Sequence, residues 1–127
     1  MEKLRFYHIR KKEMIYDECL DVNCGDIILA RGGQTIVIAN NHGINNETRD
    51  EKEITFKVGV SFCHEEDNFN KKIGREVALG RLEETKFIVI PAIFDDNITR
   101  LTLESEKFII NVTYKEGKLY VDNAWRT

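Results

Sequence analysis

The sequence contains no long apolar run and few cysteines. It never reaches the roughly eighteen consecutive apolar residues of a membrane-spanning helix, and its first stretch, MEKLRFYHIRKKEM, has no apolar run long enough for a signal peptide. We therefore expect a cytoplasmic protein without a membrane partner. The three cysteines, Cys19, Cys24 and Cys63, are odd in number and lack paired metal-ligand spacing. We expect them to be reduced and mostly structural.

Positive charge is also not in excess. The chain has 19 Lys and Arg residues against 22 Asp and Glu residues, a formal net charge of −3. A protein that coats nucleic acid without sequence preference needs a broad basic face, so we expect no DNA partner, although a local basic patch is compatible with this balance.

Recognisable catalytic motifs are absent as well. The chain shows no Ser-His-Asp order, nucleophile elbow or P-loop. The cluster from Cys63 to Asp67 has metal-binding residue types, but successive strand residues point to opposite sides and do not converge on one ion. We expect a non-enzymatic protein with no metal site and no cofactor.

The length of 127 residues predicts one domain, 1–127. Aromatic and β-branched residues predict strands in KLRFYHIR and MIYDECLDV, separated by the charged KKE. Asp26–Ala30 and Gln34–Ala39 are predicted to form a hairpin around Gly32-Gly33. The polar stretch 40–53 is predicted to be an exposed loop.

The second half predicts a strand at 54–64, a helix at about 67–85 and a strand at 86–94, which together form a split or direct βαβ candidate. Residues 95–106 favour a short helix capped by Asp95 or Asp96. The last segment, 107–125, predicts a hairpin that turns near Glu116-Gly117. The predicted fold class is α+β: a mostly antiparallel sheet built from hairpins, with one principal helix packed on it.

The predicted helix has an apolar stripe. At about 100° per residue, Phe69, Ile73, Val77 and Gly80 fall on one side, and we expect this side to lie on the sheet. Asp67 is well placed to cap the helix. Glycine within a helix lowers helix stability by about 1 kcal/mol relative to alanine. We therefore expect a packing reason for each interior glycine, and at Gly80 we expect close packing on the sheet.

Other faces of this helix suggest a second contact. Gly74 and Ala78 form a strip of small residues away from the stripe, and Leu79 and Leu82 are apolar where a surface helix is usually polar. We predict a homo-oligomer interface at these four positions. The assembly would be a dimer about a two-fold axis, or a larger oligomer such as a hexamer.

Two arginines follow the two helix glycines. Arg75 and Arg81 cannot point the same way on one helix, but arginines from two subunits could converge on one cleft. Arginine is the preferred side chain for phosphate because its planar fork offers paired donors. The alternative is that Arg75 is an ordinary solvated surface residue.

Residues 61–87 carry the pattern D-x-F-x-x-K-x-G-R followed by A-x-G-R-L. This segment resembles the first-described family of phage anti-Thoeris sponge proteins. The resemblance implies a non-enzymatic oligomer that sequesters cyclic nucleotide signals. These are a cyclic ADP-ribose isomer made by TIR-domain immune enzymes and, in some members, cyclic trinucleotides made by cGAS-like enzymes.

The resemblance also implies a ligand-binding set. Phe87 resembles a stacking ring and Asn97 an amide that reads the ligand, while Arg75 and Arg81 could grip a diphosphate. Separately from the resemblance, Trp125 and Arg126 near the end of the sequence could fold over a ligand as a stacking lid. The residues alone leave other interpretations open: Phe87 as core, Asn97 as a loop residue bonded to its own backbone, and the terminal tryptophan docked on the core edge.

Two other functions remain. A small phage inhibitor of a host defence enzyme would use the face of Leu79 and Leu82 on a foreign partner. A hydrolase of nucleotide signals is the third class, which the missing catalytic constellation disfavours.

Overall fold

The computed structural model describes residues 3–17, 22–39, 44, 52–95 and 97–127, of which 13–17, 22–28, 30 and 94 are described by backbone alone. Seven strands and one helix follow each other along the chain. They are β1 (Leu4–Asp17), β2 (Val22–Ala39), β3 (Lys52–Asn68), α1 (Lys71–Gly80), β4 (Glu83–Phe94), β5 (Ile98–Glu104), β6 (Phe108–Lys115) and β7 (Lys118–Arg126).

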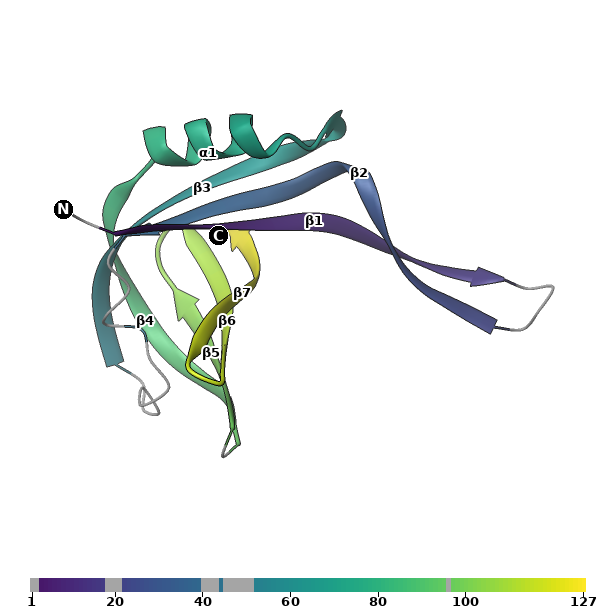
Figure 1. Ribbon diagram of the computed structural model, residues 1–127. Helices are drawn as coiled ribbons and strands as arrows, with labels where there is room; N and C mark the ends of the chain where they lie inside the picture. Colours follow the sequence, from purple (N-terminus) through teal and green to yellow (C-terminus); the bar gives the residue numbers. More distant parts are fainter. Residues whose placement is uncertain (1–2, 18–21, 40–43, 45–51, 96) are drawn as a thin grey trace.

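The seven strands form one antiparallel sheet whose spatial order is the chain order, from β1 to β7. The sheet curls strongly, so β5, β6 and β7 lie beneath the strands that carry α1 (Figure 1). Across this curl the Gln34 side chain of β2 bonds both backbone groups of Ala124 in β7. The result is a half-barrel, and the predicted α+β class with one helix on an antiparallel sheet is confirmed.

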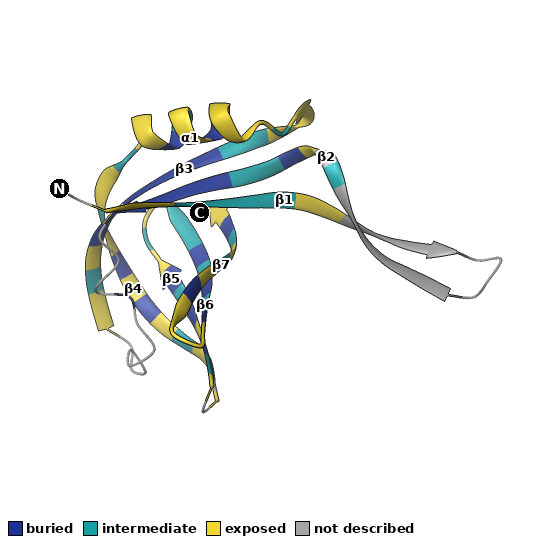
Figure 2. Ribbon diagram, viewed as in Figure 1, coloured by how far each residue is buried: buried dark blue, intermediate teal, exposed yellow. Residues whose placement is uncertain are grey.

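The core fills the concave side of the half-barrel. Buried and exposed residues alternate along β4, as expected for a strand with one face inside (Figure 2). Phe87 is fully buried, and its ring stacks on Phe56 with centroids 4.6 Å apart. The other large, fully buried side chains of this core come from β2 to β6: Ile36, Ile38, Val58, Val60, Val89, Leu101, Leu103, Ile110 and Val112.

The predicted hairpin at Gly32-Gly33 is wrong, because β2 runs through this point as one strand. Both glycines have positive φ, 73° and 129°, and the pairing of β2 with β1 and with β3 shifts register around them. They form a bulge that kinks the strand without reversing it. Similarly, the two predicted N-terminal strands are one, β1.

The predicted βαβ unit is also wrong. β3 and β4 are direct antiparallel neighbours, and Val58 pairs with Glu83 where β4 begins, so α1 is an excursion between neighbouring strands. The short helix predicted at 95–106 is strand β5, whose burial alternates with period two. The C-terminal hairpin is confirmed, with Glu116 and Gly117 both at positive φ in its turn. The loop predicted at 40–53 lies largely outside the described residues, although Ile44 is buried and residues 52 and 53 begin β3.

The helix is shorter than the predicted span of 67–85, since α1 has only ten residues, too few to cross a membrane. Asn70 rather than Asp67 caps it, and its Oδ1 accepts from the backbone N of Ile73 at 3.1 Å. Asp67 belongs to the end of β3.

The helix packs on the sheet with a different face from the one predicted. Its buried residues are Gly74 and Ala78, whereas Ile73 is 58% exposed and Gly80 meets open space. A Cβ at Gly74 would run into the Thr35 side chain of β2, and a Cβ at Gly59 of β3 would run into the Ala78 carbonyl of α1. The small strip predicted to meet a second subunit therefore covers the protein's own sheet, and the interface prediction for Gly74 and Ala78 is wrong.

Candidate functional site

A hollow opens at the end of the half-barrel where β3 extends beyond the first residue of β4. Beyond Val58, β3 has no partner on the β4 side among the described strands. Arg81, the C-cap residue of α1, takes that place, and its Nη1 donates to the Val60 carbonyl at 3.1 Å. The gap that remains faces the start of β6 and the end of β7, and it has a volume of about 310 Å³.

Cationic and aromatic side chains line this hollow. The Cζ atom of Arg126 lies 4.5 Å from the centroid of the Phe62 ring, close enough for a cation–π contact. Arg81 reaches the same hollow from α1. Lys107 and Phe108 close it from the β5–β6 side.

Two of these cations have no carboxylate partner. Glu83 forms an ion pair with Lys107, which neutralises that lysine. Neither Arg81 nor Arg126 forms an ion pair with any residue that the structure describes. Glu83 also lines the hollow, but its carboxylate is paired with Lys107. Two guanidinium groups that line one small hollow without ion-pair partners of their own are suited to bind an oxyanion, which each can hold with paired N–H donors.

A second hollow adjoins the first beneath α1. Phe62 and Arg81 line both, and the second adds the polar side chains of Thr35, Ser61 and Cys63 over about 340 Å³. Arg81 therefore lies between the cationic and aromatic hollow and a polar groove that also contains the Asp67 carboxylate.

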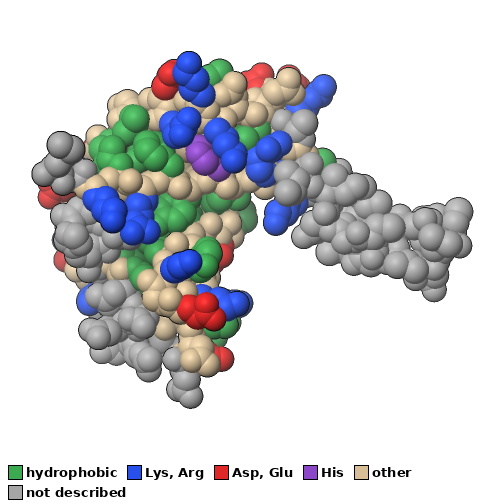
Figure 3. All heavy atoms as spheres, viewed as in Figure 1, with side chains coloured by type: hydrophobic (Ala, Val, Ile, Leu, Met, Phe, Trp, Pro, Cys, Tyr) green, Lys and Arg blue, Asp and Glu red, His purple; other side chains and the backbone are tan. Residues whose placement is uncertain are grey.

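Arg75 is not part of this site. It is exposed on α1, and with Lys71 it lies near His8 of β1. Burial, followed by the charges of Lys71 and Arg75, lowers the pKa of His8, whose Nδ1 lies 3.0 Å from the Thr35 Oγ1. Figure 3 shows lysine and arginine side chains around a histidine on this face. The structure thus separates the two helix arginines within one chain.

Phe87 and Asn97 do not join the site either. Phe87 has no exposed surface and belongs to the core, so its predicted role as a stacking ring is not compatible with this structure. Asn97 is exposed beside the β4–β5 turn, at the end of the sheet away from α1 (Figure 1), and its backbone N donates to Asp95 Oδ1. The position of Phe87 follows from the alternation of side chains along β4, which places it inward, whereas Asn97 lies in the connection between β4 and β5.

The remaining predicted residues lie on the surface. Leu79 is 41% exposed on α1, and Leu82 is partly buried just after it. Trp125, beside Arg126, is 55% exposed and does not dock on the core edge. Leu79 therefore remains available to a second subunit or to another protein.

Sequence reasoning missed Phe62 and Lys107. Phe62 stands in the strand 54–64 at an inward position, where a phenylalanine is ordinarily part of the core. Its contact with Arg126 depends on the curl of the sheet, which brings β3 near the end of β7. No local pattern around either residue signals this meeting.

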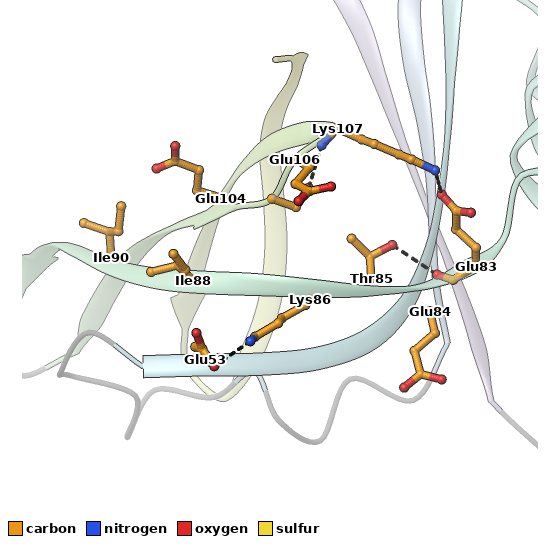
Figure 4. Close-up of a pocket in the computed structure, with 11 residues that line it drawn as sticks. Glu53, Glu83, Glu84, Thr85, Lys86, Ile88, Ile90, Glu104, Glu106 and Lys107 are labelled. Atoms are coloured by element: carbon orange, nitrogen blue, oxygen red, sulfur yellow. Dashed lines mark hydrogen bonds and ion pairs between the residues drawn. The ribbon is translucent and has the colours of Figure 1, made fainter.

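Another hollow, of about 780 Å³, lies over the start of β3, β4 and the end of β5, and it is acidic (Figure 4). Only two lysines offset its carboxylates, Lys86 paired with Glu53 at 2.8 Å and Lys107 paired with Glu83. Its carboxylates are those of Glu53, Glu83, Glu84, Glu104 and Glu106. Such a surface repels a phosphate, so size alone does not make it a site for an anionic ligand.

No group of three or more His, Cys, Asp or Glu side chains is placed to hold a metal ion in the part of the chain that the structure describes. Comparison with known protein families, curated proteins and solved structures finds no match to the chain.

Proposed function

We propose that the protein binds a cyclic nucleotide second messenger in the hollow between Arg81 and Arg126 and sequesters it without cleaving it. In this proposal it is a phage-encoded antagonist of TIR-domain immunity, and the cyclic ADP-ribose isomer is its first candidate ligand. The observation that carries the proposal is the convergence of two guanidinium groups without ion-pair partners beside the Phe62 ring. The sequence pattern at 61–87 supports the same ligand class.

Each chemical group of the proposed ligand has a matching side chain in or beside the hollow. The pyrophosphate oxygens would accept from the guanidinium groups of Arg81 and Arg126, and the adenine face would stack on the exposed Arg126 or on Phe62. A volume of about 310 Å³ is near the lower limit for small-molecule sites. The ribose hydroxyl groups would therefore extend toward Thr35 and Ser61 in the adjoining hollow.

Assembly is the second part of the proposal. Leu79 and Ile73 are both exposed on α1, on sides of the helix that lie about 120° apart. Burying these side chains against a second copy would remove apolar surface from water and form a homo-oligomer. Light scattering after size exclusion is expected to give a dimer or larger, and Leu79→Lys is expected to shift it toward monomer.

Binding is tested by incubating the protein with the TIR-derived cyclic ADP-ribose isomer, filtering, and measuring free ligand. Wild type is expected to deplete the ligand, and heating is expected to return it intact. Arg81→Gln and Arg126→Gln are each expected to weaken binding about tenfold or more, because each removes a charged donor. Arg100→Gln is the matched control, since Arg100 is an exposed arginine on β5 outside this hollow.

The other outcomes separate the alternatives. Recovery of a cleaved product would make the protein a hydrolase. A monomer that depletes no cyclic nucleotide would instead favour the inhibitor of a host defence enzyme, which would use the exposed Leu79 face on a foreign partner.

A further inference from the structure

A separate hollow lies at the opposite end of the β6–β7 hairpin. The Arg81–Arg126 site adjoins Phe108 at the start of β6, whereas this hollow adjoins Tyr114 and the β6–β7 turn. It has a volume of about 620 Å³, well within the range of small-molecule sites. The residues considered below are Arg5, Tyr7, Tyr114, Lys118 and Tyr120.

Two tyrosine hydroxyls at this hollow have no hydrogen-bond partner. Tyr114 is only 8% exposed, and its Oη is buried without a partner among the described residues, as is the Oη of Tyr7. A buried hydroxyl without a partner destabilises a fold by about 1–3 kcal/mol, and native proteins leave few of them. The Arg5 guanidinium lies within hydrogen-bonding reach of Tyr7 and acts to lower its pKa, so the Tyr114 Oη is the hydroxyl whose bonding something else would complete.

The charges around the hollow favour an anion. Arg5 and Lys118 line it, and no carboxylate does among the described residues. Neither cation forms an ion pair within the described part of the chain. This is the reverse of the acidic surface over β4 and β5.

The tyrosines keep their protons at neutral pH. Burial raises the pKa of both hydroxyls, and at Tyr7 the nearby Arg5 guanidinium opposes that rise. Each hydroxyl can therefore donate a proton to a hydrogen bond, which a carboxylate or phosphate oxygen would accept. Arg5 is exposed and lies on the same face of β1 as Tyr7, so it can turn with an incoming anion.

We propose that this hollow is a second binding site, for a small aromatic anion that carries a carboxylate or a phosphate. Its oxyanion pairs with Arg5 and Lys118 and accepts from the hydroxyls of Tyr7 and Tyr114. Its ring lies against Tyr120. The site is independent of the Arg81–Arg126 hollow and of what binds there.

Benzoate and phenyl phosphate are the probes, and neutral benzyl alcohol is the control ligand, with affinity measured by calorimetry. Wild type is expected to bind at least one anion and to bind benzyl alcohol about tenfold more weakly or worse. The preferred anion distinguishes a carboxylate from a phosphate ligand. The proposal is overturned if neither anion binds at millimolar concentration, or if benzyl alcohol binds equally well.

Tyr114→Phe is the variant that best distinguishes a binding role from a structural one. Removing an unpartnered hydroxyl is expected to leave the melting temperature of the free protein unchanged or higher, while anion affinity falls about tenfold or more. If Tyr114 had only a structural role, its substitution would not lower the anion affinity while leaving the melting temperature unchanged. Unchanged anion affinity in Tyr114→Phe would contradict the assigned site.

Lys118→Gln and Lys115→Gln form a matched pair, since both lysines are exposed in the same hairpin but only Lys118 lines the hollow. Only Lys118→Gln is expected to weaken anion binding. Tyr114→Phe is also expected to leave cyclic nucleotide depletion intact, and Arg126→Gln to leave benzoate binding intact. Failure of one site thus remains distinguishable from failure of the other.

Discussion

The contact between α1 and β3 leaves no room for a side chain at Gly59. A methyl group there would overlap the Ala78 carbonyl oxygen and would lie 3.0 Å from Ala78 C and from Leu82 N. All three obstacles are backbone atoms, which cannot rotate away as a flexible side chain can. Gly59→Ala must therefore move the helix off the sheet.

Such overpacking costs about 1–3 kcal/mol, and rigid backbone obstacles place Gly59→Ala at about 3 kcal/mol. Alanine also restricts the unfolded chain, which returns about 0.5–1 kcal/mol. The net loss is about 2 kcal/mol in the free energy of unfolding. With a urea slope of about 2 kcal/mol per molar, the midpoint should fall by about 1 M.

Gly80→Ala is the matched control. A Cβ at Gly80 meets nothing within 4 Å, and Gly80 ends the helix without positive φ. This variant is expected to be stabilised by about 0.5 kcal/mol, because alanine favours the helix and restricts the unfolded state. Urea unfolding followed by circular dichroism measures both variants. Equal midpoints for Gly59→Ala and wild type would refute the packing described here.

Two further predictions concern the sheet. Gln34→Leu would remove the side-chain partners of the backbone N–H and carbonyl of the buried Ala124, which lie at 2.9 and 2.6 Å. The free energy of unfolding should therefore fall by about 2 kcal/mol in urea titrations. An unchanged urea midpoint would contradict this link between β2 and β7. The lowered pKa of His8 means that its contribution to stability is present above its usual value of 6.5 and is lost as pH falls below it. Wild type should therefore lose more stability than His8→Asn between pH 7.5 and 5.5, and equal losses would contradict the burial of His8 beside Lys71 and Arg75.

Part of the candidate site was accessible from the sequence. The sequence predicts Arg81 and Arg126 as ligand residues, and the structure brings both to one hollow with Phe62. The sequence predicts Arg75 as a ligand residue on the same grounds as Arg81, but Arg75 lies near His8 instead, because residues six apart on a helix diverge. The resemblance implies that Phe87 stacks on the ligand, but the register of β4 places this side chain in the core.

Local patterns in the sequence determined the elements that depend on local physics. Alternating apolar residues produced the strands that build the sheet, and the turn at Glu116-Gly117 produced the C-terminal hairpin. The periodic segment near residue 70 produced the helix, and the sum was an α+β domain.

Only the tertiary structure decided which face of the helix is buried and which charged groups meet. The sequence places Ile73 and Val77 on the predicted buried side, but the helix packs with Gly74 and Ala78, because Gly74 leaves room for the Thr35 side chain and Gly59 leaves room for the Ala78 carbonyl. Arg81 and Arg126 come together because the sheet curls, and no pattern within a few residues of either arginine contains that curvature.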